Sequence, residues 1–324
     1  MNNIKNLSLF GVCFAFVVIA LGAWTRLVDA GLGCPDWPGC YGFVVFPTDA
    51  AEIALAESRF PSFPYDINKA IPEVVHRYFA ATLGLIAIFL AYISFKHTNN
   101  QRLRWWSLGL LIFICCQGLF GYLTVSLKLL PIIVTGHLFG GFFTLSLFFY
   151  IFLKAGNFDI LNKMKIPHLK NISLVAMAFL LFQIFLGAWT STNYASLACV
   201  DFPTCQGTFL PEMDFKEGFN FSQEVGPNYL YGLLDNSARV AIHYSHRVSA
   251  ILVTIVFLIL ISKLWFSAAA PLASTLGILL LTQISLGIIN VVYVLPLYVA
   301  IAHNLIAATL LLATLTVNYL AWKK

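Results

Sequence analysis

Long apolar stretches alternate with short polar ones along the chain. A bilayer core needs roughly 20 consecutive apolar residues per helix, and eight segments reach that length. We predict eight membrane-spanning helices at Leu7–Val28, Pro72–Phe95, Trp105–Leu127, Pro131–Leu153, Ile172–Thr192, Ser237–Ile261, Ala268–Val292 and Pro296–Ala321. The first lacks a convincing small-residue cleavage site, so it is interpreted as a helix rather than a signal peptide.

Composition supports a membrane protein. Of the 324 residues, 60% are hydrophobic and 10% are charged, whereas soluble proteins have about 25% charged residues. The net charge is +5, but the basic residues are scattered among apolar segments and form no patch or stripe. We therefore expect an all-α polytopic membrane protein with no nucleic-acid partner.

The basic residues of the short loops indicate an orientation, because lysine and arginine favour the cytoplasmic side. Eleven basic residues fall on one side of the predicted spans: Lys5, Lys96, Arg102, Arg104, Lys154, Lys163, Lys165, Lys170, Lys263, Lys323 and Lys324. Thirteen of the fourteen acidic residues fall on the other side, with Asp159 the exception. Both termini are expected in the cytoplasm, and the two long loops, residues 29–71 and 193–236, outside.

The chain contains an internal repeat. The stretch LGAWTRLVDAGLGCPDWPGCYG from Leu21 returns as LGAWTSTNYASLACVDFPTCQG from Leu186. Later matches pair His76-Arg77 with His246-Arg247, Gln117 and Gly121 with Gln283 and Gly287, and Pro131 and His137 with Pro296 and His303. We predict two four-helix bundles, residues 1–165 and 166–324. Because each half has an even number of helices, a pseudo-two-fold axis should run along the membrane normal.

Each long loop contains one Cys-x5-Cys pair, Cys34 with Cys40 and Cys199 with Cys205. An oxidising exterior favours disulfide bonds, and neither pair has a histidine nearby that would favour a metal site. Disulfide bonds are the preferred interpretation, with metal binding as the alternative. The other cysteines, Cys13, Cys115 and Cys116, fall inside predicted helices and are expected to be buried.

Four histidines share one predicted depth. His76, His137, His246 and His303 each come shortly after the outer start of a helix, and at about 1.5 Å of rise per residue all four lie in the outer leaflet. Two histidines per bundle are too few for zinc or copper, whereas haem iron needs only two axial ligands. The alternative is that they are ordinary core histidines.

Arginines accompany these histidines. Arg77 and Arg247 directly follow two of them, and Arg26 and Arg239 are further candidates. A guanidinium group pairs well with a carboxylate such as a haem propionate, although each arginine could instead extend to the membrane surface. His243 lies one helical turn before His246 and is a rival ligand or a hydrogen-bond partner.

The two halves differ three residues before the first histidine, where Glu73 in one corresponds to His243 in the other. A carboxylate one turn from a haem ligand could transfer a proton or stabilise a developing cation. Glu73 could instead cap the start of its helix, where a negative charge is favourable, and Pro72 just before it is consistent with such a start.

These features resemble the haem A synthase family over nearly the full length. The resemblance includes the eight helices, the tandem halves, the Glu-x-x-His-Arg of Glu73, His76 and Arg77, the later histidines and the cysteine pairs. It implies oxidation of the C8 methyl group of haem O to a formyl group by successive hydroxylation, which gives haem A for terminal oxidases.

The resemblance also implies residue roles. His76 and His137 would flank the substrate haem O, and His246 and His303 would ligate a resident haem b that relays electrons. Glu73 would be the catalytic carboxylate. Cys34 and Cys40 would take part in activity or electron transfer, whereas Cys199 and Cys205 would form a more structural pair.

The expected location is the inner membrane of a bacterial cell. Apart from haem O and membrane lipid, the candidate partners are haem O synthase, oxidase assembly factors and a second copy of the chain. The competing interpretation is a di-haem b-type electron-transfer protein without substrate chemistry.

Overall fold

The computed structural model describes residues 2–156, 166–267 and 269–322. Its eight long apolar helices are α1 (Asn2–Leu27), α3 (Ile67–His97), α4 (Gln101–Ser126), α5 (Pro131–Gly156), α6 (Leu169–Thr192), α8 (Asn236–Trp265), α9 (Ala270–Val292) and α10 (Leu297–Trp322). Each is long and apolar enough to cross a membrane. The described residues form no β-strand beyond two isolated bridges, so the all-α fold with eight spans is confirmed.

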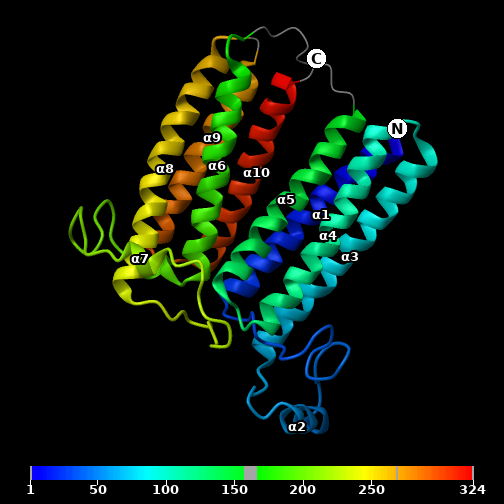
Figure 1. The fold of residues 1–324 in the computed structure, drawn as a ribbon, viewed down its shortest axis with the longest axis vertical. Coiled ribbons are helices and arrows are strands. Elements are labelled where there is room, and N and C mark those ends of the chain that lie inside the picture. The colour runs from blue at the N-terminus through cyan, green and yellow to red at the C-terminus, as the bar shows by residue number, and fades with distance from the viewer. Residues whose placement is uncertain (1, 157–165, 268, 323–324) are drawn as a thin grey trace. The chain divides into compact units, whose positions relative to one another are not determined.

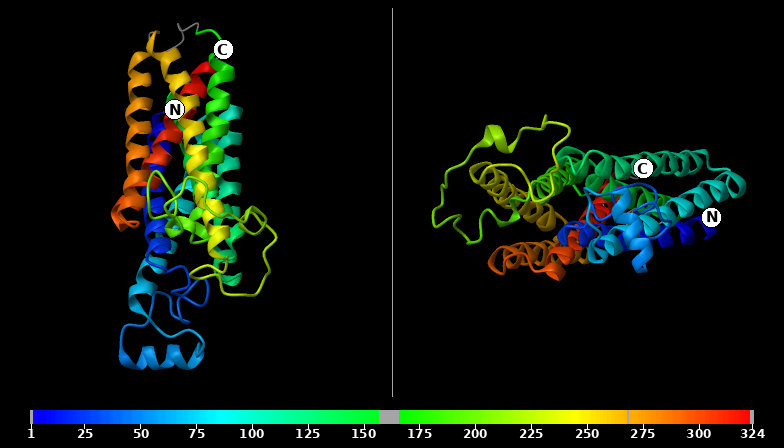
Figure 2. Two further views of the ribbon diagram at one scale, coloured as in Figure 1. Left: turned by 90° about the vertical axis from the view of Figure 1, so that its left-hand side faces the viewer. Right: turned by 90° about the horizontal axis from the view of Figure 1, so that it is seen from below.

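The long loops contain three short helices, α2 (Ala50–Arg59), the 3-10 helix η1 (Ala195–Leu197) and α7 (Phe215–Gly218). In Figures 1 and 2, α2 lies beyond the end of its bundle at which α3 begins. Asp49 caps α2, since its side chain accepts hydrogen bonds of 2.9 Å from the backbone N–H groups of Ala51 and Glu52. This helix was not predicted, since the sequence indicated only a long connection at residues 29–71.

The chain divides into two compact units. Unit 1 extends to Ile151 and also includes Phe221–Leu233. In it, α1 packs on α3 and α3 packs on α4. The 221–233 segment comes from the second long loop, yet Tyr229 is 5% exposed and shares a hydrophobic cluster with Leu129 and Leu130 of the α4–α5 connection. The Tyr229 N–H donates to the Lys128 carbonyl at 3.0 Å.

Unit 2 comprises Phe152–Asn220 and the chain from Leu234 onward. Its helices close into a ring, because α6 packs on α8, α8 on α9, α9 on α10 and α10 on α6. The Asn318 side chain on α10 donates to the Ser173 carbonyl on α6 at 2.9 Å. The fully buried Trp189 indole donates to the Gly218 carbonyl at 2.8 Å and so ties α7 to the bundle.

The start of the second predicted span was placed too late. The helix begins at Ile67 after the N-cap Asp66, which accepts a 2.9 Å hydrogen bond from the Asn68 N–H. Pro72, interpreted as a helix start, lies inside the helix, and its carbonyl accepts a 3.0 Å hydrogen bond from the Thr25 hydroxyl. A cap aspartate therefore outweighs the proline as the start signal.

The prediction for the free cysteines was wrong, because Cys13, Cys115 and Cys116 are exposed. Their burial was inferred from helix location alone, but the outer face of a membrane helix contacts acyl chains, where a small apolar side chain is equally suitable. Several residues used in the orientation argument lie outside the described residues, namely Asp159, Lys163, Lys165, Lys323 and Lys324, as does the predicted helix start Ala268. The cytoplasmic placement of the termini stays a prediction.

Candidate functional site

Two of the predicted ligands meet in unit 1. His76 on α3 and His137 on α5 have ring centroids 6.4 Å apart and ring planes at 89°. A bond between a metal and an imidazole nitrogen is about 2 Å long, so two rings on opposite sides of one metal ion have centroids roughly 6 Å apart. The separation of these rings therefore fits one metal ion between them.

Each of the four imidazoles lies against a glycine of another helix. A Cβ atom at Gly22 would lie 2.9 Å from Cε1 of His76, and one at Gly187 would lie 3.1 Å from Cε1 of His246. The corresponding distance is 3.3 Å for Gly121 with His137 and for Gly287 with His303. All four rings are half-buried. The same glycine contact thus recurs for every predicted iron ligand.

Three of the rings also contact a glutamine four residues before that glycine. The Nε2 atom of Gln117 lies 3.1 Å from Nδ1 of His137, and that of Gln183 lies 3.1 Å from Nδ1 of His246. Nε2 of Gln283 lies 3.1 Å from Nε2 of His303. The sequence interpretation paired Gln117 with Gln283 and missed Gln183. The recurring Gln-x3-Gly spacing could have found it.

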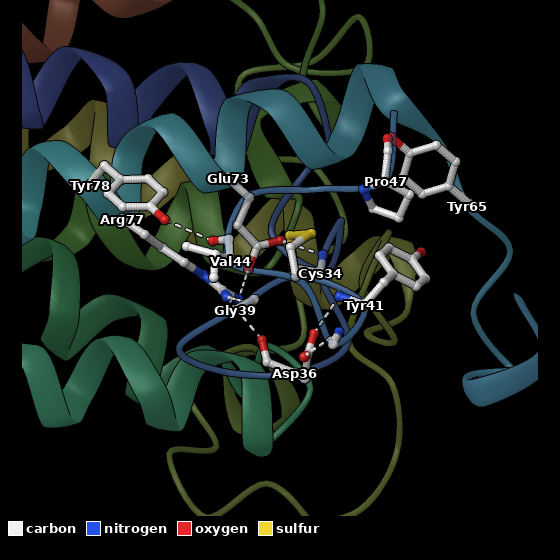
Figure 3. The surroundings of a disulfide bond; sticks show 12 residues. Cys34, Asp36, Gly39, Tyr41, Val44, Pro47, Tyr65, Glu73, Arg77 and Tyr78 are labelled. Carbon is white, nitrogen blue, oxygen red and sulfur yellow. Dashed lines mark hydrogen bonds and ion pairs between the residues drawn. A yellow bond between two sulfur atoms is a disulfide. The ribbon is translucent and has the colours of Figure 1, made fainter. Parts of the chain in front are cut away.

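The predicted catalytic carboxylate is buried beside the first disulfide. Glu73 is 4% exposed, accepts a 2.9 Å hydrogen bond from the Cys34 N–H and forms a 2.5 Å ion pair with Arg77 (Figure 3). It lies in the second turn of a helix already capped by Asp66. The alternative that Glu73 caps the helix is therefore wrong.

The cysteine pairs are disulfide bonds in both long loops, Cys34–Cys40 and Cys199–Cys205, each with a Cα–Cα distance of 4.8 Å. Nowhere in the described ranges do three or more His, Cys, Asp or Glu residues gather closely enough to hold a metal ion. The arrangement favours the disulfide interpretation over the metal alternative.

The arginine after each first histidine holds its cystine loop. Arg77 donates to the carbonyls of Asp36 at 2.8 Å and Gly39 at 2.6 Å. Arg247 donates to the carbonyls of Thr204 and Cys199, both at 2.8 Å. These guanidinium groups are engaged by the protein, so their predicted contact with haem propionates would require sharing or exchanging those partners, and it stays a prediction.

His243 occupies the place of Glu73 in unit 2. It is 5% exposed, and its Nε2 accepts a 3.3 Å hydrogen bond from Nε of Arg247. That nitrogen is engaged by a cation, whereas His246 faces Gln183 and Gly187. These contacts favour His246 over His243 as the ligand.

Two groups in the loops have perturbed pKa values. Burial, followed by the negative charge of Glu73, raises the pKa of Tyr41 to about 12, and the Tyr41 hydroxyl donates to the Pro64 carbonyl at 3.1 Å. Hydrogen bonds from the Thr204 hydroxyl and then the Gly207 N–H lower the pKa of Asp201 to about 2. Tyr41 therefore stays neutral and Asp201 stays ionised over the physiological pH range.

The remaining arginines differ in their engagement. Arg26 lies 3.5 Å from Asp29, whereas Nε of Arg239 is buried and has no hydrogen-bond partner among the residues that the structure describes. Among the arginine candidates, Arg239 thus has a buried N–H group that a propionate could accept from.

Other buried atoms in the same regions also have no hydrogen-bond partner in the described part of the chain: His76 Nδ1, His303 Nδ1, Gln183 Oε1 and Gln283 Oε1. Leaving a buried polar atom unpaired costs about 1–3 kcal/mol, so such atoms are expected to meet a ligand or rearrange around one. Ring nitrogens could bind iron and a guanidinium N–H could bind a propionate. The residues present fit a haem in each half.

Comparison with known proteins finds a family and several relatives. The family described as cytochrome oxidase assembly protein matches residues 5–315. A haem A synthase of Shewanella oneidensis is 41% identical over 96% of this chain and 94% of its own length. Haem A synthases of Rickettsia felis and Rickettsia bellii are 30% and 29% identical, with at least 94% of each chain covered.

Proposed function

We propose a haem A synthase activity for this chain, which belongs to the cytochrome oxidase assembly protein family. The reaction would convert the C8 methyl group of haem O to a formyl group by successive hydroxylation. The first half, residues 1–165, would hold the substrate, and the second half, residues 166–324, would hold a resident haem b that relays electrons. Both haem sites would lie towards the outer face of the membrane.

One difference between the halves supports assigning the substrate to the first half and haem b to the second. Both halves repeat the histidines, the glycine contacts and the disulfide loop, but among the described residues a buried carboxylate one turn from a predicted ligand, Glu73, occurs in the first half alone. The corresponding residue of the second half is His243. A buried carboxylate supports chemistry that moves protons or stabilises positive charge, and a purely electron-transferring site has no need of one.

His76 and His137 would hold the substrate haem, while His246 and His303 would hold haem b. When bound, the haem iron supplies the oxidising chemistry that no side chain can perform. His76 on α3 and His137 on α5 would hold the porphyrin from two helices, and Glu73 lies on the first of these, one turn before His76.

Glu73 would act on protons released as the methyl group is oxidised. Its Oε2 accepts from the Cys34 N–H and its Oε1 pairs with Arg77, yet each carboxylate oxygen has a second lone pair that could accept a proton. Arg77 stabilises the ionised form and fixes its orientation through the carbonyls of the disulfide loop. The carboxylate is thereby oriented in advance, as general acid–base catalysis requires.

The decisive experiment is expression in a host that produces haem O but has no haem A synthase. Extracted pigments are then analysed by mass. The proposal expects haem A, whose mass differs from that of haem O by one added oxygen and two lost hydrogens. Unmodified haem O alone, with two haem b per chain, would instead support the di-haem electron-transfer protein.

A further inference from the structure

One of the four imidazoles has no glutamine beside it. The glutamines at 117, 183 and 283 each precede the glycine under a ring by four residues. The residue four positions before Gly22, the glycine under His76, is Val18. The buried Nδ1 of His76 has no hydrogen-bond partner among the described residues.

A second hydrogen-bond partner matters for an imidazole that binds a metal. Such a ring donates its other N–H to an acceptor, which fixes the tautomer and the ring rotation and makes the ring a better ligand; removing that partner typically lowers metal affinity roughly 10–100-fold. A glutamine can accept through Oε1 and donate through Nε2. The buried Oε1 atoms of Gln183 and Gln283 have no partner within the described ranges, so half a turn of the amide would present an acceptor to the ring in place of the donor.

The glutamine also engages the main chain of its histidine. Nε2 of Gln183 donates to the His246 carbonyl at 3.1 Å, and Nε2 of Gln117 donates to the His137 carbonyl. Presenting Oε1 to the ring N–H would exchange this Nε2 bond to the carbonyl for a bond to the ring, so in either orientation the glutamine amide contacts its histidine. Val18 has no polar side-chain atom and supplies neither contact, so His76 has the packing against Gly22 but no glutamine to orient its ring.

We propose that Gln117, Gln183 and Gln283 are positioning residues for three imidazoles, and that Val18 leaves His76 as the weakly held ligand, so that the first half exchanges its haem while the second half retains one. The inference rests on the proposed function only in assigning the rings to haem iron. It gives a physical basis for a substrate site that must release its product and a resident site that must not.

The test measures haem release from the full-length chain. In one background, His246→Ala with His303→Ala leaves only the first-half site; in the other, His76→Ala with His137→Ala leaves only the second. Both are loaded with iron protoporphyrin IX, and its transfer to excess apomyoglobin is followed by Soret absorbance. We expect release from the first half to be about 10-fold faster or more.

Substitutions should then slow haem release from the first half and accelerate it from the second. Val18→Gln in the first-half background should slow release about 10-fold, and Gln183→Val in the second-half background should accelerate it by roughly 10–100-fold. Gln183→Glu keeps an acceptor and should retain haem better than Gln183→Val. Val17→Gln is the matched control, because the neighbouring Val17 is 43% exposed on the same helix, and it should leave release unchanged.

Equal release rates from the two halves, or release from Gln183→Val no faster than from its parent, would overturn the inference. If the Val18→Gln protein loses its helical circular dichroism signal, the test uses the second-half background instead. There, Gln183→Val must release haem faster than Gln183→Glu. The assay involves neither haem O nor turnover. The expected release rates without haem A production would therefore reject only the proposed function, whereas haem A production with equal release rates would reject only this inference.

Discussion

The backbone N–H of Cys34 donates a 2.9 Å hydrogen bond to Oε2 of Glu73. The buried carboxylate is therefore positioned by a residue of the disulfide bond, 39 positions earlier in the sequence. Arg77 completes the arrangement, because it pairs with Glu73 and also donates to the Gly39 carbonyl inside the disulfide loop. In the proposed reaction, the disulfide, the arginine and the carboxylate act as one unit.

Opening the first disulfide should therefore impair the proposed chemistry. In Cys34→Ser with Cys40→Ser, the loop that holds Glu73 is less constrained, and we expect haem A formation to fall by up to about 100-fold, the lower range of general acid–base contributions. Haem b content should persist. The measurement is the ratio of haem A to haem O in extracts. The matched control, Cys199→Ser with Cys205→Ser, opens the loop beside His243 and should affect haem b content more than that ratio. Indistinguishable phenotypes would contradict the prediction.

Neutralising the carboxylate should stop the reaction without emptying the site. Glu73→Gln keeps an oxygen that can accept from the Cys34 N–H but loses the charge beside Arg77, so we expect haem A formation to fall by about 10²–10⁴-fold. Haem O should remain bound in the purified protein. Pigment analysis of the purified protein gives both quantities. Haem A at parental levels would remove Glu73 from the mechanism.

The glycine contacts predict a steric effect on haem binding. Gly121→Ala places a Cβ 3.3 Å from Cε1 of His137, whereas a Cβ at Gly118 on the same helix meets nothing within 4 Å. Overpacking typically costs about 1–3 kcal/mol, and moving the ring also displaces a ligand. Gly121→Ala should reduce the Soret absorbance per chain of the first-half site, and Gly118→Ala should not. Equal absorbance in both variants would argue against the ring position.

Gly22→Ala should act more strongly, because its Cβ would lie 2.9 Å from Cε1 of His76. In the His246→Ala/His303→Ala background, the Soret absorbance per chain should therefore be lower for Gly22→Ala than for Gly121→Ala. A Gly22→Ala protein that binds haem as well as Gly118→Ala does would contradict it.

The second disulfide loop should loosen in acid. The pKa of Asp201 is lowered from 3.8 to about 2 by the Thr204 hydroxyl and the loop N–H groups. A lowered pKa in the folded state gives a stabilisation that is present above about pH 4 and lost as the pH falls through 2. Amide hydrogen exchange at Gln206 and Gly207, whose N–H groups donate to Asp201, should accelerate across that window. Asp201→Asn should show fast exchange with no such step, and a step of equal size in that variant would contradict the assignment.

The lengths of the apolar stretches were sufficient to predict the eight spans, because a bilayer imposes a minimum length on every helix. It placed the start of α3 at Pro72 because a proline is conspicuous in sequence, whereas the cap formed by Asp66 is recognised mainly by its hydrogen bond to Asn68. The short helix α2 escaped detection for a related reason. Ten residues are too few for a clear pattern within a polar loop.

The four histidines were predicted as a set because the internal repeat aligns them, and the structure brings the rings of His76 and His137 together. Their partners were less accessible. Gln183 has no glutamine at the matching position of the first half, since Val18 stands there, so comparing the halves pair by pair does not select it. The contacts of Arg77 and Arg247 with loop carbonyls could not be foreseen, because they depend on how each disulfide folds the loop back over its helix.

The 221–233 segment limits where this duplicated chain could be divided into two separate polypeptides. Tyr229 covers Leu129 and Leu130 of unit 1, and the Lys69 ammonium group donates to the Tyr231 hydroxyl at 3.2 Å, yet both tyrosines are encoded after α6. A polypeptide truncated behind α5 would expose those leucines and leave the start of α3 without this anchor. Two separately translated fragments divided there would have to reassemble by docking the 221–233 segment of the second fragment onto the first, so gene fission between the copies would be disfavoured.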